Sequence, residues 1–225
     1  MIAEILATGD EIRSGALIDS NSAYIAEKLE EIGIPVTRHS CVGDDFEALV
    51  SILKEISTRV DICVVTGGLG PTADDLSSEA AASAAGERLD LDTKALSDIE
   101  AFFRSRKREM AASNRKQAML PRTAEAMYNP VGTAPGFSLK IGACVFFFLP
   151  GVPTEMKRML FHEVLPRIEK MPGALKEHCL VRNISTFGLT ESATGEKVAE
   201  LTDAFPDIKI GLRAKFPEIH VKLYL

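Results

Sequence analysis

The chain has 225 residues, of which 46% are hydrophobic and 26% are charged, and its formal net charge is −6. This composition is that of an ordinary globular protein, and the length fits one domain of about 150 to 170 residues with a small appendage. The acidic balance excludes proteins that bind nucleic acid through clustered cations, so we expect no nucleic-acid partner.

The sequence shows no targeting or membrane signal. Glu4 interrupts the apolar stretch near the amino terminus, and no basic segment precedes it. The longest apolar run, residues 141–149, is far shorter than the roughly 20 residues that a membrane helix needs. The four cysteines lack CxxC spacing and the four histidines lack paired spacing, so a zinc site has little support. We expect a cytoplasmic protein with no membrane partner.

The first third of the chain alternates strand and helix patterns. Residues 2–7 are a nearly unbroken apolar run, typical of a strand buried on both faces. Residues 22–32 predict a helix that Ser20 or Ser22 can cap, and the chain returns through a strand at 36–42.

A second unit of the same kind follows. Residues 44–56 predict a helix, in which Asp44 and Glu47 have the spacing of a capping box. Asp44 is therefore at least as easily a helix cap as a ligand-binding residue. Residues 60–65 predict a third buried strand. Strands that alternate with helices indicate right-handed crossovers and a parallel sheet that is covered on both sides.

The middle of the chain is richer in helix patterns. Residues 76–85 and 96–103 predict two helices, of which Thr93 can cap the second, and residues 111–119 predict a shorter one. Residues 137–141 and 144–149 then predict two paired strands. A helix that begins at Pro153 or Thr154 is expected after them.

The last part of the chain predicts a small α+β unit. A linker at 171–173 separates it from the preceding helix. Its expected elements are strand, helix, strand and strand, at residues 178–186, 190–202, 207–213 and 218–225.

Four polar loops follow predicted strand ends. Because ligands of doubly wound sheets bind outside the carboxyl ends of the strands, we expect these loops to converge on one site. The loops are Thr8-Gly9-Asp10-Glu11, Gly43-Asp44-Asp45, Thr66 to Asp75, and Pro150-Gly151-Val152-Pro153.

The loop after the third strand, TGGLGPTADD, joins glycines to acids. Gly67, Gly68 and Gly70 let backbone N–H groups approach a phosphate, although a plain tight turn explains such glycines equally well. The lysine of a P-loop is absent. Asp74 and Asp75 would repel a phosphate by about 4 kcal/mol per charge pair at about 4 Å in a partly shielded site. A divalent cation held by these aspartates, with Asp44 or Asp10, would offset that repulsion.

Several segments, read in order, resemble a known family. They are "TGDEIRSGALIDSNSAYIAEKLEEIGI", "VGDD", "TGGLGPTADDLSSEA", "NPVGTAPGF" and "LPGVPTEM", within residues 1–170. They look like the molybdopterin-binding (MoaB/Mog-like) domain, most closely the version in CinA, the competence/damage-inducible family. Residues 171–225, with "FGLTESATGEKVAEL", resemble part of the KH-like middle domain of CinA proteins. The deamidase domain of long CinA proteins has no counterpart in the sequence, so we do not expect its activity.

The resemblance implies a three-layer α/β/α domain with a mostly parallel sheet, joined to a small and incomplete α+β appendage. It implies a hydrolase that cleaves ADP-ribose or a similar dinucleotide pyrophosphate with a divalent metal ion (Mg, Mn or Co). Asp44 and Asp75 match the two key carboxylates of the adenylyl-transferring branch. Because the family often self-associates, a homo-oligomer such as a dimer is expected.

Two other functions stay open. One is the binding or adenylylation of molybdopterin, and the other is a non-catalytic nucleotide-binding or oligomerisation module. In the leading hypothesis Asp44, Asp75 and Lys116 are catalytic, Asp44, Asp74 and Asp75 hold the metal, and Asn114 and Gln117 contribute. The expected substrate-binding residues are Thr8, Gly9, Asp10, Glu11, Asn21, Gly67, Gly68, Leu69, Gly70, Pro71, Thr72, Gly136, Pro150, Gly151, Pro153 and Glu155.

Overall fold

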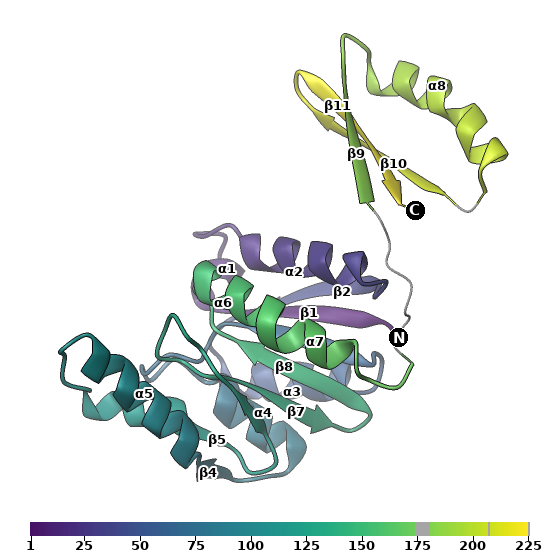
Figure 1. Cartoon of the computed structure of the whole chain (residues 1–225). Helices are drawn as coiled ribbons and strands as arrows, with labels where there is room; N and C mark the ends of the chain where they lie inside the picture. Colours follow the sequence, from purple (N-terminus) through teal and green to yellow (C-terminus); the bar gives the residue numbers. More distant parts are fainter. Residues whose placement is uncertain (174–180, 207, 225) are drawn as a thin grey trace. The chain divides into compact units, whose positions relative to one another are not determined.

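The computed structural model in Figure 1 describes residues 1–173, 181–206 and 208–224. The chain divides into two compact units. One is made of residues 1–30 and 34–175, and the other of residues 31–33 and 176–225.

The first unit alternates strands and helices, as the apolar periodicity predicts. Its elements are β1 (Ala3–Thr8), α1 (Asp10–Arg13), α2 (Ser20–Glu31), β2 (Val36–Val42), α3 (Phe46–Ile56), β3 (Ile62–Thr66), α4 (Ser77–Ala85), β4 (Leu89–Leu91), α5 (Thr93–Ser105), the 3-10 helix η1 (Ala112–Ala118), β5 (Met119–Pro121), β6 (Glu125–Met127), β7 (Gly136–Ile141), β8 (Cys144–Leu149), α6 (Pro153–Met159), the π-helical segment η2 (Leu160–Val164) and α7 (Leu165–Ile168).

The main sheet has six strands in the order β2-β1-β3-β8-β7-β6. Strands β2, β1, β3 and β8 pair in parallel, and β7 runs antiparallel to both of its neighbours. Helices α2, α6 and α7 lie in front of the sheet in Figure 1, and α3 and α4 lie behind it. The predicted three-layer α/β fold with a mostly parallel sheet is therefore confirmed. A separate antiparallel pair, β4 with β5, was not predicted.

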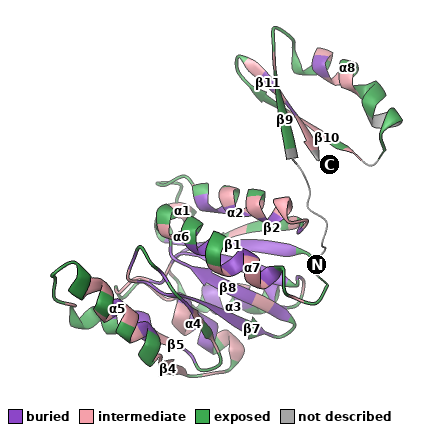
Figure 2. Cartoon of the chain, in the orientation of Figure 1, coloured by how far each residue is buried: buried purple, intermediate pink, exposed green. Residues whose placement is uncertain are grey.

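The central strands are buried on both faces. Side chains alternate along a strand, so each strand supplies apolar groups to both helix layers. Behind the sheet, Leu6 of β1 and Val65 of β3 belong to one core cluster with Leu53 of α3. In the same cluster the rings of Phe137 and Phe148 stack with their centroids 4.4 Å apart. Figure 2 shows these strands mostly buried between helices whose outer faces are exposed.

The caps of three helices differ from the predicted ones. Asp19, Asp45 and Asp92 each accept a hydrogen bond from the backbone N–H three residues further on, at 2.8 to 2.9 Å. A carboxylate at this position satisfies an N–H group that the first helical turn leaves free. The prediction of Asp44 as the cap of α3 is wrong, because Asp45 caps that helix.

The second unit is a three-stranded antiparallel sheet with one helix. Its elements are β9 (Val181–Phe187), α8 (Glu191–Ala204), β10 (Lys209–Lys215) and β11 (Glu218–Tyr224), and the strand order is β10-β11-β9. The predicted succession of strand, helix, strand and strand is confirmed for the described residues. Residues 178–180 and 225 of the predicted strands, and residue 207, lie outside them. Among the described helices of both units, none has the length and apolar character needed to cross a bilayer.

A buried ion pair holds the start of β1. The side chain of Glu4 is 1% exposed, and Arg59 donates to both of its oxygens, at 2.9 and 2.8 Å. Ser40 of β2 donates a third hydrogen bond at 2.7 Å. Burial alone would raise the pKa of Glu4, but the bonds from Arg59 and Ser40 outweigh it and hold that pKa below its usual value. Three segments of the chain are thus joined at one carboxylate.

We expect Arg59→Met to lower the free energy of unfolding by about 3 kcal/mol, because it leaves a buried carboxylate without its cation. The measurement is urea unfolding at neutral pH. Arg88→Met is the control, since Arg88 pairs with Asp90 on the surface and its loss should cost no more than about 0.5 kcal/mol.

The same pair predicts a pH dependence. Because the pKa of Glu4 is lowered in the folded state, its contribution to stability is present above the ordinary glutamate pKa of about 4.3 and is lost as the pH falls through the folded-state value. The stability difference between wild type and Arg59→Met should shrink as the pH falls below about 4. A difference that stays constant with pH would contradict this account.

Candidate functional site

A cavity of about 420 Å³ lies at the carboxyl ends of β1, β3 and β8. The loops that follow these strands line it, together with Asp44 from the end of β2. Helices α1 and α6 begin at this end of the sheet (Figure 1). The four polar loops that we expected to converge therefore contribute to one cavity.

Most of the predicted site residues line this cavity. They are Thr8, Gly9, Glu11, Asn21, Asp44, Gly67, Gly68, Leu69, Gly70, Pro71, Asp74, Asp75, Pro150, Gly151, Pro153 and Glu155, and Gln117 joins them.

Five predicted residues lie outside the lining. Asp10 and Thr72 donate backbone hydrogen bonds to lining carboxylates. Asn114 is buried and donates to Oε1 of the lining residue Gln117 at 2.9 Å. Lys116 donates to the carbonyl oxygen of Thr72 at 2.9 Å and borders a small neighbouring cleft. Gly136 lies inside β7, where a Cβ would be 2.6 Å from the carbonyl oxygen of Phe148, so close packing explains this glycine.

The glycine loop has a shape that only glycine permits at its start. Gly67 has φ 112°, and a Cβ there would lie 2.5 Å from two oxygens of Thr8. Its N–H donates to the carbonyl oxygen of Leu149 at 3.0 Å, so this group is already used. By contrast, no described residue accepts a hydrogen bond from the N–H groups of Gly68, Leu69 or Gly70. These three are the donors that an anion can use.

Asp75 and Asp44 are not helix caps. Helix α4 begins after Leu76, and the Asp75 carboxylate instead accepts from the backbone N–H of Thr72 at 2.8 Å and from its hydroxyl. The Asp44 carboxylate accepts from the backbone N–H of Asp10 at 3.1 Å. Asp75 is held within its own loop and Asp44 by the loop after β1, and both line the cavity. The helix-cap alternative that the sequence left open for Asp44 is therefore removed.

The acids of the cavity differ in their ionisation. Burial raises the pKa of Asp44, and the negative charges of Asp10, Glu11 and Asp74 raise it further, although the Asp10 N–H opposes them. The pKa of Asp74, which is exposed, is lowered, because the polar hydrogens of Thr72 and of the loop backbone lie near its carboxylate. Asp44 therefore lies among like charges that a bound cation would relieve.

The donor set suits a hard cation, but it is small. Among the described residues, no group of three or more His, Cys, Asp or Glu side chains is close enough to hold a metal ion. Mg²⁺ is commonly bound by one or two carboxylates together with substrate phosphates and water. Asp44, Asp74 and Asp75 offer only oxygen ligands, so one or two of them would suit a hard cation that arrives with a phosphorylated ligand.

Asn21 ties two loops of the cavity together. Its Nδ2 donates to Thr66 Oγ1 at 3.0 Å and to the carbonyl oxygen of Gly151 at 2.8 Å. The carbonyl of Gly151 is an acceptor only, so the orientation of the amide is fixed. No described residue donates to its buried Oδ1. Asn21 therefore acts through its Nδ2, which joins the end of β3 to the loop after β8.

Glu155 reaches the cavity with the help of a residue that the sequence analysis missed. Asn129 Nδ2 donates to Glu155 Oε2 at 2.6 Å and to the carbonyl oxygen of Ala134 at 2.9 Å. Its Oδ1 accepts from the backbone N–H groups of Val131 and Gly132. The loop NPVGTA is therefore wrapped around one buried amide. An asparagine before a Pro/Gly-rich segment was the available signal.

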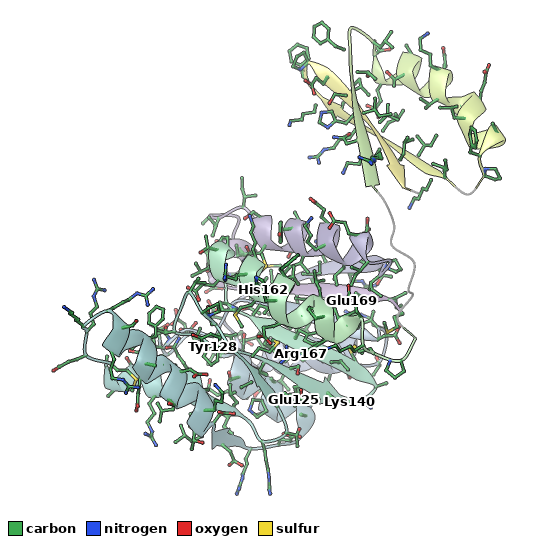
Figure 3. The ribbon with its side chains drawn as sticks, in the orientation of Figure 1. Glu125, Tyr128, Lys140, His162, Arg167 and Glu169 are labelled. Carbon is green, nitrogen blue, oxygen red and sulfur yellow. The ribbon has the colours of Figure 1, made fainter. Side chains whose placement is uncertain are left out.

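Other lining residues were also missed. They are mostly apolar or come from the segment that leads into α2: Ala7, Ile12, Leu17, Ile18, Asp19, Ser20, Thr133 and Ala134. Thr66 and Val152 also line the cavity, as expected for members of the converging loops. A separate cavity of about 140 Å³ has Tyr128 and His162 in its wall, and Figure 3 shows both on one face of the first unit.

Substitutions of the neighbouring residues Asp44 and Asp45 should differ in their effect on the free energy of unfolding. Asp45→Ala should lower the free energy of unfolding by about 1 kcal/mol, because α3 loses its cap. Asp44→Asn should not lower it, since the change removes a charge from an acidic surrounding. The measurement is urea unfolding of both variants at neutral pH without added metal. Equal losses in the two variants would show that Asp44 is structural.

Comparison with known proteins agrees with this geometry. Residues 4–170 match the family model described as "Probable molybdopterin binding domain". A CinA-like protein of Desulfosudis oleivorans is 49% identical over 223 residues, which are 99% of this chain and 54% of that protein. The NMN amidohydrolase-like protein YfaY of Escherichia coli K12 is 44% identical over 220 residues, which are 98% of this chain and 54% of that protein. The chain thus spans about half the length of these curated relatives.

A solved structure is similar as well. The protein CinA of Thermoplasma acidophilum is 33% identical, with a TM-score of 0.66, and the likeness covers 71% of this chain and 94% of that chain. The match of the family model to most of the first unit and this likeness in sequence and structure lead to one conclusion: the chain belongs to the molybdopterin-binding domain family, in its CinA branch.

Proposed function

We propose that the first unit hydrolyses the phosphoanhydride of ADP-ribose or of a similar dinucleotide pyrophosphate, with a divalent metal ion. One observation carries the proposal. The carboxylates of Asp44, Asp74 and Asp75 line the same cavity as the glycine loop, whose N–H groups at residues 68–70 have no acceptor among the described residues. Donors for phosphate and ligands for a cation therefore face one space.

The backbone donors and the carboxylates of the cavity have different roles in this proposal. The N–H groups of residues 68–70 bind and orient a phosphate, and helix α4 begins shortly after them, so its dipole also favours negative charge there. Asp44 and Asp75, with Asp74, would hold the cation that accompanies the phosphate. A divalent ion bound in this way polarises a phosphoryl oxygen and makes its bound water more acidic.

Lys116 acts on this site through the loop. It does not line the main cavity of the described residues, but its Nζ donates to the carbonyl oxygen of Thr72, and Thr72 donates to Asp75. We propose that Lys116 positions the 72–75 segment instead of contacting the reacting phosphate. Glu79, 3.6 Å from its Nζ, orients the ammonium group.

The test of the proposal is product analysis. Wild-type protein with ADP-ribose and Mg²⁺ or Mn²⁺ should form AMP, and Asp75→Asn and Asp44→Asn should each reduce the rate at least about 100-fold, because each removes a charge that holds the cation. Asp45→Asn is the matched control. Asparagine is as good a helix cap as aspartate and Asp45 lies outside the cavity lining, so this variant should keep its rate. AMP formation by Asp75→Asn at the wild-type rate would remove the assignment.

Removal of metal gives a second test. Treatment with EDTA should abolish AMP formation, and added Mg²⁺ or Mn²⁺ should restore it, because hard cations prefer the all-oxygen donor set. Zn²⁺ should be a weaker replacement, since neither Cys nor His lines the cavity within the described part of the chain. The readout is the rate of AMP formation at a fixed total salt concentration. A rate unaffected by chelation would contradict the role given to the aspartates.

A second candidate function is the binding or adenylylation of molybdopterin. The observation in its favour is the family match, since the model that covers residues 4–170 describes a probable molybdopterin binding domain. The same donors would bind the phosphate of that ligand. Co-purification of a pterin, together with no AMP from ADP-ribose under any metal, would favour it. Tight nucleotide binding without turnover would favour a non-catalytic module.

A further inference from the structure

We propose that a second cavity, between the start of α5 and the segment that joins β6 to β7, is a binding site for a small organic cation with one flat ring. The cavity has a volume of about 280 Å³. It borders the 420 Å³ cavity only at Thr133, which lines both. The proposal concerns a different site from the one that carries the proposed function, so it does not rest on that function.

The inner wall of the second cavity is apolar. Ala95 and Ile99 of α5 and Met127 of β6 are buried side chains that line it. An apolar cavity of about 150 Å³ is large enough to take up benzene, so this cavity has room for a ring with a short substituent. Tyr128 also lines the cavity and is 53% exposed, so its ring offers a flat surface for stacking on the solvent side.

The polar groups of the cavity favour a positive charge. The carboxylates of Asp92 and Asp98 line it, and the face of the Tyr128 ring is electrically negative. An ammonium group already lies there, because Lys94 Nζ is 2.8 Å from Asp98 Oδ2 and 5.9 Å from the centroid of the Tyr128 ring. The hydrogen bond with Asp98 and the charge of its carboxylate raise the pKa of Lys94. The lysine thus shows which charge these side chains accept.

Lys94 can leave this position for water. Its side chain is 79% exposed, and Asp98 lies one turn further along the same helix. Ion pairs of this exposed kind contribute little to stability, so breaking this one costs little. A ligand cation can therefore replace the ammonium group beside Asp98 and Tyr128. The ring of that ligand would in addition cover the apolar inner wall and remove it from water.

The wall on the side of the main cavity is held from within. Asn129 is 6% exposed, and its amide bonds to the Glu155 carboxylate and to three backbone groups of its own loop. Gly132 and Thr133 of the same loop line the second cavity. The second cavity is therefore bounded by a fixed loop, and a ligand in it would contact the loop that places Glu155 in the main cavity.

The experiment compares three probes that share one ring and differ in charge: benzylammonium, benzyl alcohol and benzoate. Binding is measured by NMR titration of the isotope-labelled full chain. The signals followed are the backbone N–H groups of Ala95 and Met127, which line the second cavity but not the first. Benzylammonium should shift these signals at millimolar concentration. The alcohol and benzoate should bind at least about 5-fold more weakly, because neither brings a positive charge to Asp98 and Tyr128.

Two substitutions of exposed residues test the charge preference in opposite directions. Asp98→Asn should weaken benzylammonium binding about 5-fold, because the carboxylate that accepts the cation is lost. Lys94→Met should strengthen it about 3-fold, because the competing ammonium group is removed. Lys140→Met is the matched control, since Lys140 is exposed and does not line the cavity, and it should leave the affinity unchanged.

Three results would overturn the inference. Tighter binding of benzoate, lost in Lys94→Met, would make the cavity an anion site. Unchanged signals of Ala95 and Met127 with all three probes would mean that the cavity takes up no such ligand. Equal strengthening by Lys94→Met and Lys140→Met would mean that the probe responds only to the net charge of the protein. None of these readouts depends on the cleavage of ADP-ribose, so failure of this inference and failure of the proposed function are distinguishable.

Discussion

The close approach of the β1 and β3 ends is the constraint on which the site depends. Gly67 lies so near Thr8 that no side chain fits between them, and its N–H is committed to the end of β8. Three neighbouring strands are therefore joined at one point by backbone contacts. The chain turns away after Gly67, and the N–H groups of residues 68–70, which line the cavity, donate to no described residue. The packing of the strand ends thus leaves three free backbone donors in one loop of the cavity wall.

The aspartates make the cavity acidic, and their surroundings differ. Asp44 lies among like charges that raise its pKa, and the hydrogen bond from the backbone N–H of Asp10 partly offsets this increase. Asp75 is held by Thr72 and does not cap α4. The like charges around Asp44 oppose folding, as is common where a residue serves a site instead of stability.

Much of this arrangement could be predicted from the sequence. The β-branched apolar runs and the 3.6-residue periods identify the strands and helices, and the loops that follow buried strands point to the cavity. The caps could not be predicted, because Asp44 and Asp45 are equally good cap residues and only the start of α3 decides between them. The contact of Lys116 with the carbonyl oxygen of Thr72 could not be predicted either, because a single lysine in a 3-10 helix carries no periodic signal.

The buried Glu4–Arg59 pair has a consequence for how such a protein can diversify. Glu4 lies near the amino-terminal end of β1, whereas the cavity is at the carboxyl-terminal end of the same strand. The buried Glu4–Arg59 pair and the residues of the cavity therefore lie at opposite ends of β1. Loops at the cavity can therefore be replaced by loops with different ligand preferences while the Glu4–Arg59 pair stays intact. Residues needed for stability and residues that set ligand preference occupy separate ends of the sheet.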